Sequence, residues 1–258
     1  MTGTAMSDTD FVIEARGLSR KFADFMAVSN VDLKVKRGHI HALIGPNGAG
    51  KTTCFNLLTK SIEPTAGRIL YNRRDITGMT PAQVAQLGMV RSFQISAVFP
   101  TLSVLDNIRV ALQRASGTSF RFWRSDQSLD VLNVRAYALL QDVGLTDKAV
   151  AIAGDLSYGR KRALEIATTL ALEPEFLLLD EPTAGMGLED VAATAALIRR
   201  VARTRTVLMV EHNLGVVAEL ADRITVLAGG KVLVEGSYAE ISGDARVQEA
   251  YIGRRAKA

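Results

Sequence analysis

The stretch GPNGAGKTT, from Gly45 to Thr53, constrains the fold of this chain more than any other part of the sequence. It fits the phosphate-binding pattern G-x-x-x-x-G-K-[ST] at every fixed position. Glycines allow backbone conformations that a Cβ atom forbids, so the loop can curl until successive N–H groups point at a phosphate chain. The apolar run HALIG precedes the loop and helical character follows it. The pattern therefore predicts a strand, a phosphate-binding loop and a helix.

This loop also supplies a cation and a metal ligand. Lys51 is expected to reach the β- and γ-phosphates of ATP, and the Thr52 hydroxyl is expected to bind Mg²⁺. The predicted nucleotide-binding residues of the loop are Gly45, Pro46, Asn47, Gly48, Ala49, Gly50, Lys51, Thr52 and Thr53. A plain glycine turn between a strand and a helix is the alternative interpretation of the same letters.

A second motif, FLLLDEP, carries two adjacent carboxylates. Its four apolar residues predict a buried strand that ends at Asp180 and Glu181. Asp180 is expected to hold Mg²⁺ from the second coordination shell of the ion. Glu181 is expected to polarise the water that attacks the γ-phosphate. The motif alone also fits a strand with an acidic end, but with the glycine loop it predicts ATP hydrolysis.

The rest of the chain predicts an α/β fold. Hydrophobic residues make up 48% of the 258 residues and charged residues 22%, enough apolar character for a substantial core. Apolar strands alternate with helices, which predicts a mostly parallel sheet covered on both faces. Strands expected at Phe11–Leu18 and Val28–Val35 are assigned to an antiparallel β subdomain, and the helical spacing of about 95–170 predicts a helical subdomain. The expected fold is thus a P-loop NTPase core with these two additions.

The composition says more about the cellular location of the chain than about its ligand. The net charge is +4, which fits an anionic ligand or a membrane surface but also many soluble enzymes. The single cysteine, Cys54, excludes an internal disulfide. No apolar run approaches the ~18 residues of a spanning helix, and the N-terminus lacks the layout of a signal peptide. These features predict a cytoplasmic protein.

The stretch LSYGRKRALEIA, from Leu156 to Ala167, lies upstream of the acidic motif. Together with the P-loop, the Asp180–Glu181 pair and the VEH that ends at His212, it resembles the ATP-binding-cassette family of transport ATPases. The resemblance extends from about Phe11 to Gly253. It implies one nucleotide-binding domain over residues 11–253, between a flexible N-terminus (1–10) and a basic tail (254–258).

Further roles follow from the resemblance alone. Phe22 takes the position of an aromatic residue that stacks on adenine, although core packing is the plainer alternative. Gln94 matches the glutamine that senses Mg²⁺ and the attacking water, and His212 matches the histidine that contacts the γ-phosphate. In the family, Ser157 and Gly159 reach the γ-phosphate of a nucleotide held by a second cassette, so two head-to-tail chains enclose two ATP molecules.

Three positions depart from the usual family pattern. The commonest signature reads LSGGQ, whereas this chain has LSYGR, with Tyr158 and Arg160 at the changed positions. Ser157 and Gly159 are retained, so the expected phosphate contact is preserved. Gly187 stands where the family often has an aspartate that communicates across the dimer. Communication through a carboxylate at that position is therefore excluded.

The LSYGR signature, the insertion before LLQDVGL and the ending EGSYAEISGDARVQEAYIG resemble the cassette of branched-chain amino acid importers. Cassettes of lipopolysaccharide exporters and of amide or urea importers are the alternatives. A nucleic-acid or ribosome-associated ATPase and a module that holds ATP without turnover are alternatives of other classes. The insertion, about 114–128, interleaves aromatic and basic residues, which fits a solvated face, a membrane surface or nucleic acid.

The resemblance also implies partners. These are two membrane permease subunits, a second identical or paralogous cassette, and indirectly an extracytoplasmic solute-binding protein. No nucleic acid is expected. The chain is expected to lie peripherally on the cytoplasmic face of the inner or plasma membrane, with ATP and Mg²⁺ as cofactors.

Overall fold

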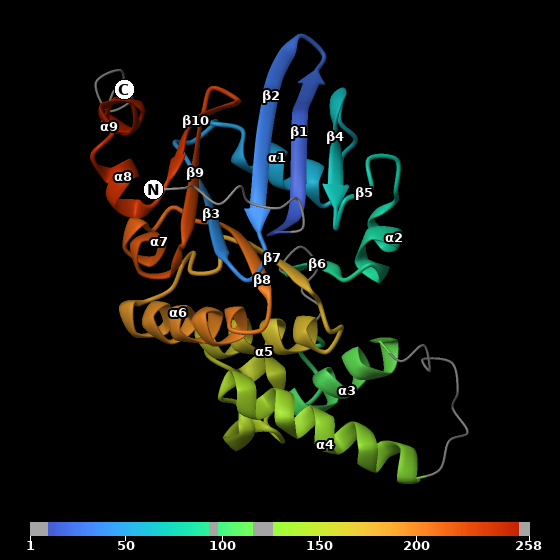
Figure 1. Cartoon of the computed structure of the whole chain (residues 1–258). Helices are drawn as coiled ribbons and strands as arrows, with labels where there is room; N and C mark the ends of the chain where they lie inside the picture. Colours follow the sequence, from blue (N-terminus) through green and yellow to red (C-terminus); the bar gives the residue numbers. More distant parts are fainter. Residues whose placement is uncertain (1–9, 93–97, 116–125, 253–258) are drawn as a thin grey trace, which may run out of the picture.

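The computed structural model describes residues 10–92, 98–115 and 126–252. Figure 1 shows two sheets in the upper part of the molecule and a group of helices below them. The smaller sheet is antiparallel and has the strand order β2-β1-β4-β5. Its strands are β1 (Phe11–Phe22), β2 (Phe25–Lys36), β4 (Ala66–Tyr71) and β5 (Arg74–Asp75).

The larger sheet has the order β10-β9-β3-β8-β7-β6, and its pairs are parallel except for the β9–β10 edge. Every residue of β3 and β8 is buried, as the unbroken apolar runs IHALI and TVLMV require of strands covered on both faces. The six strands are β3 (Ile40–Ile44), β6 (Met89–Ser92), β7 (Phe176–Asp180), β8 (Thr206–Val210), β9 (Arg223–Ala228) and β10 (Lys231–Gly236).

Helices cover the sheets and form the lower part of the molecule. The helices of the described residues are α1 (Lys51–Leu58), α2 (Pro81–Gln86), α3 (Val104–Ala115), α4 (Asp126–Val143), α5 (Tyr158–Leu170), α6 (Leu188–Ala202), α7 (Leu214–Leu220), α8 (Tyr238–Ser242) and α9 (Ala245–Ile252), with 3₁₀ turns at Thr146–Lys148 and Ala153–Asp155. Helices α3, α4 and α5 pack on one another, and α5 also contacts α6 and β6 (Figure 1). This makes α5 the link between the helical group and the larger sheet.

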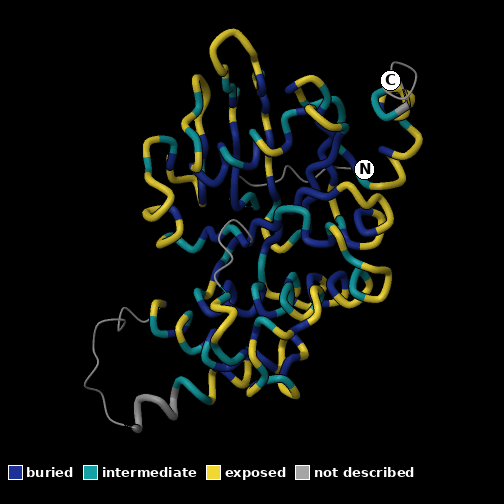
Figure 2. The backbone as a smooth tube through the Cα atoms, turned by 180° about the vertical axis from the view of Figure 1, so that it is seen from behind, coloured by how far each residue is buried: buried dark blue, intermediate teal, exposed yellow. Residues whose placement is uncertain are grey.

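The core lies on the two faces of the larger sheet. Ile40, Ala42 and Ile44 of β3 pack in a cluster with the helical group, whereas Leu43 packs in a second cluster with α1 and the antiparallel sheet. Figure 2 shows the buried residues gathered along the central strands and the exposed ones at the hairpin tip and outer loops. Period-two alternation in β3 therefore places the two layers on opposite faces.

The structure confirms the mostly parallel sheet and extends some predicted elements. Strand β1 runs beyond Leu18 to Phe22, because it continues to pair with β2 up to Phe25. Thr80 caps α2 through a capping box, with Pro81 at the first helical position. Helices α8 and α9 follow β10 and were not anticipated by the sequence analysis.

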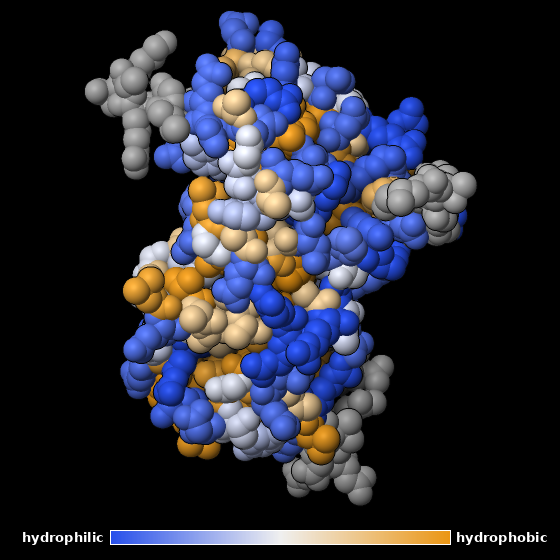
Figure 3. All heavy atoms as spheres, turned by 60° about the vertical axis from the view of Figure 1, so that its left-hand side comes forward, coloured by the Kyte–Doolittle hydropathy of each residue, from blue (hydrophilic) through white to orange (hydrophobic). Residues whose placement is uncertain are grey.

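Some predictions concern residues that the structure does not describe. These are residues 1–9 of the predicted N-terminal segment, Gln94, the part of the insertion over 116–125, and the tail at 254–258. Among the described residues, no helix combines the length and apolar character needed to cross a bilayer. Figure 3 shows apolar and hydrophilic side chains interleaved across the middle of one face.

Candidate active site

The predicted motifs converge because they follow neighbouring parallel strands. The glycine loop leaves the carboxyl end of β3, His212 follows β8, and Asp180 with Glu181 ends β7. Strands β3, β8 and β7 are adjacent in the larger sheet and run in the same direction. In open parallel sheets, ligands bind outside the carboxyl ends of the strands. The topology thus brings these motifs to one edge of the sheet.

Two positions of the loop require glycine, because a Cβ atom would collide with neighbouring backbone and because φ is positive at both. Gly45 has φ +150°, and a Cβ there would lie closer than 3.0 Å to the carbonyl oxygen of Leu227 in β9. Gly50 has φ +97°, and its Cβ would lie 2.6 Å from the carbonyl oxygen of Ala27. Neither contact is with a flexible side chain, so an added methyl group would have to move backbone. The loop is therefore wedged between β9 and β2.

Lys51 stabilises the curled shape of the loop. It is buried, and its Nζ donates to the carbonyl oxygens of Gly45 (2.7 Å) and Pro46 (3.1 Å). Helix α1 begins at Lys51 without a side-chain cap, which leaves its first N–H groups for a ligand. Thr52, next in the helix, is exposed. The start of α1 is therefore open to a ligand, and phosphate binding by the loop stays a prediction.

Asp180 is held by an arginine to which the sequence analysis assigned no role. Arg91 Nη2 lies 2.5 Å from Asp180 Oδ2, and its Nη1 donates to Asn56 Oδ1 at 2.7 Å. The same guanidinium lies over the ring of Phe55, 4.7 Å from its centroid. Asn56 and Phe55 belong to α1. Arg91 therefore ties the end of β7 to the helix that follows the glycine loop.

The donor set suits Mg²⁺ that is held largely by a nucleotide. The Thr52 hydroxyl and the Asp180 carboxylate are hard oxygen ligands of the kind this ion prefers. Within the described ranges there is no group of three or more His, Cys, Asp or Glu side chains that could hold a metal. Thr52 and Asp180 are the residues that would hold the ion beside the phosphates of a nucleotide.

Glu181 and His212 form a direct pair. His212 Nε2 lies 2.7 Å from Glu181 Oε1, and both side chains are partly exposed. The backbone of Glu181 has φ +47°, a left-handed conformation that non-glycine residues seldom adopt. Its N–H donates to the carbonyl oxygen of Val210 at 2.9 Å, which joins the turn after β7 to the end of β8. The predicted base and the predicted switch histidine thus share one hydrogen bond.

A buried carboxylate, Glu211, positions the segment that carries His212. Glu211 is 2% exposed and accepts from the backbone N–H of His212 (2.8 Å) and of Asn213 (3.0 Å). It also accepts from Thr183, through the backbone N–H (2.9 Å) and the hydroxyl. Asn213 in turn caps α7. Glu211 therefore joins the histidine segment to the turn that carries Glu181.

Glu211→Gln is expected to lower the free energy of unfolding by about 1–3 kcal/mol, because an amide nitrogen replaces one oxygen that accepts two hydrogen bonds. ATP turnover should fall as His212 loses its fixed position. Thermal unfolding and steady-state ATPase assays measure these effects. The matched control is Glu219→Gln, at an exposed glutamate, which should change neither quantity appreciably. Equal stability of the two variants would contradict the role given to Glu211.

Ser157 and Gly159 begin α5 rather than join the glycine loop. Ser157 occupies the N-cap position and is exposed, and its side chain makes no capping hydrogen bond. A Cβ on Gly159 would overlap the carboxylate of Asp190 in the first turn of α6. The packing of α5 against α6 therefore leaves no room for a side chain at Gly159.

Phe22 lies at the end of β1, beside the tip of the β1–β2 hairpin. Its side chain is 41% exposed, and the Arg20 guanidinium lies 4.6 Å from the ring centroid. The core-packing alternative is wrong for this residue, since the ring is not buried. Gln94 lies outside the described residues, two positions beyond Ser92 at the end of β6.

The C-terminal helix adds a contact that the sequence analysis missed. Tyr251 in α9 packs against the core cluster that the larger sheet shares with the helical group, and burial raises the pKa of its phenol. The ending AYIG was noted only as a family feature. Arg91 and Glu211 were missed for a different reason. Both adjoin recognised motifs in sequence, and a charged residue next to an apolar strand was the available signal.

The comparisons with known proteins agree with this geometry. Residues 28–184 match the family described as ABC transporter, and residues 231–257 match the description branched-chain amino acid ATP-binding cassette transporter. The chain belongs to the ABC transporter family. It is an ATPase subunit homologous to the transport ATP-binding proteins BraF and LivG.

The match to these relatives covers nearly the whole chain. BraF of Pseudomonas aeruginosa and LivG of Escherichia coli, both named as high-affinity branched-chain amino acid transport ATP-binding proteins, are each 36% identical over 94% of this chain and 98% of their own length. A crystal structure of the ADP conformation of MJ1267, an ATP-binding cassette of an ABC transporter, superposes with a TM-score of 0.82 at 26% identity. It covers 94% of this chain and 99% of that chain. The α/β cassette fold is thereby confirmed.

Proposed function

We propose that this chain hydrolyses Mg²⁺-ATP to power the import of branched-chain amino acids through membrane permeases. The observation that carries the proposal is the Glu181–His212 pair, at the same sheet edge as the glycine loop. A loop alone binds a nucleotide, whereas a carboxylate held beside it supplies a base for turnover.

Nucleotide binding is assigned to the loop and its neighbours. The N–H groups of Gly45 to Thr53 cradle the phosphates, and Lys51 pairs with the β- and γ-phosphates. Phe22, exposed at the hairpin, stacks on adenine. Thr52 and Asp180 hold Mg²⁺, which neutralises phosphate charge when it is bound. Gln94 is assigned to the metal and the attacking water by resemblance.

For the chemical step, Glu181 takes a proton from the attacking water. The water oxygen bonds to the γ-phosphorus as the bond to the β–γ bridging oxygen breaks. His212 orients Glu181 through their hydrogen bond and contacts the γ-phosphate. The left-handed backbone of Glu181 fixes where the carboxylate points.

A second cassette completes the site in this proposal. Ser157 and Gly159 lie at the start of α5, and Ser157 is exposed without a capping role in its own chain. Large exposed apolar side chains follow Ser157, Glu181 and His212 closely in the sequence. They are Tyr158, Leu188 and Leu214. Head-to-tail pairing of two chains would cover them and bring Ser157 to the partner's γ-phosphate.

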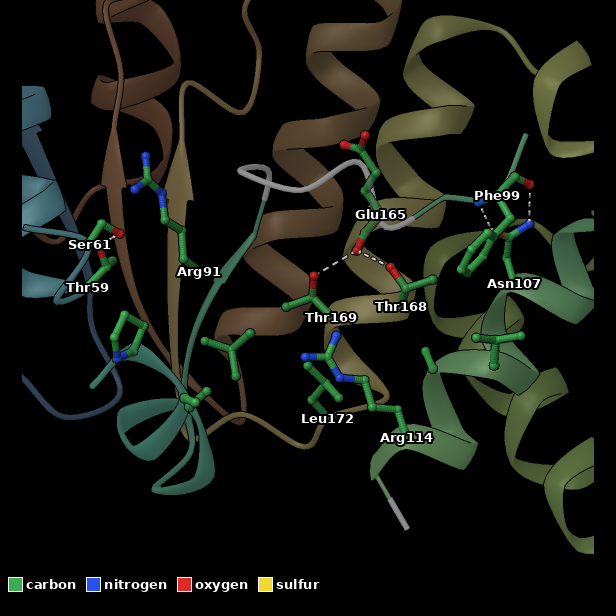
Figure 4. A pocket seen from close by; sticks show the side chains of 16 residues that line it. Thr59, Ser61, Arg91, Phe99, Asn107, Arg114, Glu165, Thr168, Thr169 and Leu172 are labelled. Atoms are coloured by element: carbon green, nitrogen blue, oxygen red, sulfur yellow. Dashed lines mark hydrogen bonds between the residues drawn. The ribbon is translucent and has the colours of Figure 1, made fainter. Parts of the chain in front are cut away.

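The docking site for the permease is assigned to a cavity of about 710 Å³, which lies between the larger sheet and the helical group. Figure 4 shows Thr59, Ser61 and Arg91 on one side and the side chains of α3 and α5 on the other. Phe99 and Val110 are partly exposed there, and Arg114 adds a charge at the rim. A short amphipathic helix from a permease fits this mixture, with the chain peripheral to the cytoplasmic face of the membrane.

The cargo assignment rests on the C-terminal match and the two named relatives. Its test is reconstitution of the cassette with the permeases that co-purify with it from membranes. ATP turnover in proteoliposomes should rise several-fold when the external receptor carries leucine, isoleucine or valine. It should fall to background when EDTA removes Mg²⁺.

Three outcomes would contradict parts of the proposal. Stimulation by urea or short amides in place of branched-chain amino acids would overturn the cargo but not the ATPase. Co-purification with ribosomes or DNA instead of permeases would overturn the transport role. Turnover that is unaffected by EDTA would overturn the metal assignment.

A further inference from the structure

One arginine spans from α5 to the turn that carries the catalytic carboxylate. Arg162 Nη2 donates to the carbonyl oxygens of Asp180 (3.2 Å) and Glu181 (2.9 Å), and its Nε donates to that of Pro182 (3.2 Å). Its Nη1 lies 3.1 Å from Glu165 Oε2, one turn further along α5. The Arg162 side chain is only 12% exposed. A single guanidinium therefore binds three consecutive carbonyls of the turn.

This turn needs such support because its backbone is unusual. Glu181 has φ +47°, so the local chain does not favour the observed conformation by itself. Pro182 has no N–H group, and the strand pairing of β7 ends at Asp180. The planar, multidentate fork of an arginine suits several fixed acceptors better than a lysine ammonium does. Arg162 thus holds the backbone that aims the Glu181 carboxylate.

The helix that carries Arg162 also carries the residues assigned to the partner's nucleotide. Ser157 occupies the N-cap position of α5, and Arg162 lies about 7.5 Å further along the axis, at 1.5 Å per residue. Gly159, between them, packs against Asp190 of α6. A helix is stiff over this distance, so a displacement of its first turn moves the Arg162 guanidinium as well. The carboxylate that often links the two sites in the family is replaced by Gly187 in this chain.

We infer that Arg162 is a positioning residue that couples the start of α5 to Glu181 of the same chain. When Ser157 engages the partner's ATP, α5 and Arg162 set the turn so that Glu181 faces its own attacking water. The inference rests on the proposed head-to-tail dimer. It assigns the link between the two sites to a guanidinium and three carbonyls in place of a carboxylate at position 187.

The test is the substitution of Arg162 by methionine and by lysine in the full chain. Arg162→Met is expected to lower kcat at least ~10-fold, while the Kd for ATP in the absence of turnover changes less than ~2-fold. The Hill coefficient for ATP should fall towards 1. Arg162→Lys keeps the charge and part of the contact, so its kcat should lie between those of Arg162→Met and the unsubstituted chain.

Two controls separate positioning from general effects of charge or stability. Arg160→Met removes an exposed arginine from the same helix and should leave kcat within ~2-fold. Glu165→Gln removes the ion-pair partner and keeps the three carbonyl contacts, so it should affect kcat less than Arg162→Met. If Arg162→Met fails to fold, the kcat values of Arg162→Lys and Glu165→Gln are compared with that of the unsubstituted chain instead.

Several results would overturn the inference. One is an Arg162→Met protein with unchanged kcat and Hill coefficient, and another is a parallel loss of kcat in Arg160→Met. A Hill coefficient of 1 in the unsubstituted chain would remove the coupling that Arg162 is inferred to transmit. In each case the Glu181→Gln variant still reports on the proposed ATPase, so the two ideas fail separately.

Discussion

Glu181→Gln is expected to reduce steady-state ATP hydrolysis by a factor of about 10²–10⁴, the usual contribution of a general base. The amide keeps the size of the side chain and an oxygen that can accept a hydrogen bond from His212 Nε2, now 2.7 Å from Glu181 Oε1. It cannot take a proton from water. ATP should therefore still bind, with an affinity close to that of the unsubstituted chain.

The same variant should accumulate as an ATP-bound dimer, because hydrolysis is the step that removes the bridging γ-phosphate. Size-exclusion chromatography with Mg²⁺-ATP, alongside an ATPase assay, measures both effects. Glu189→Gln is the matched control, since it removes a carboxylate from an exposed position in the first turn of α6. Normal turnover by Glu181→Gln would mean that another group acts as the base.

Most residues of the candidate site could be proposed from the sequence because they lie in short contiguous motifs. Asp180, Glu181 and His212 lie at or just after strand ends, and Lys51 follows the loop that leaves β3. Parallel strands place their carboxyl ends at one edge of the sheet. The roles of residues that are contiguous in the sequence can be predicted once the strand and the loop that carry them are recognised. The same logic predicted the parallel sheet, whose apolar runs are long and distinct.

Contacts that join distant segments were not readable in this way. Arg162 meets Asp180 across 18 residues, Glu211 meets Thr183 across 28, and Arg91 meets Asp180 across 89. Nothing local states which of many arginines will reach a given carbonyl or carboxylate. The partner depends on strand order and helix packing, which emerge only in the assembled fold.

The C-terminal helices illustrate a signal that was present but not used. Ser237 and Glu240 have the S-x-x-E spacing of a capping box, and the structure contains both of its hydrogen bonds at the start of α8. The helix that follows has only 5 residues, which is too short for periodicity to give support. Its packing against β9 and β10 stabilises it instead.

Gly45→Ala is expected to lower the free energy of unfolding by about 3 kcal/mol or more and to raise the Kd for ATP at least ~100-fold. The new Cβ would lie closer than 3.0 Å to the carbonyl oxygen of Leu227, and φ at this position is +150°. Relief requires a shift of β9 or of the loop itself. Either shift moves N–H groups that are assigned to the phosphates.

Gly38→Ala separates the two causes of that loss. Gly38 also has a positive φ, +73°, but its Cβ would meet nothing within 4 Å. This control should cost about 1–2 kcal/mol from backbone conformation alone and leave the ATP affinity unchanged. Thermal unfolding and equilibrium binding of a fluorescent ATP analogue distinguish the variants. If the two alanine variants behaved alike, the close approach of β9 to the loop would not govern nucleotide binding. The Lys51 ammonium would then be the main determinant of the shape of the loop, since it already binds the carbonyls of Gly45 and Pro46.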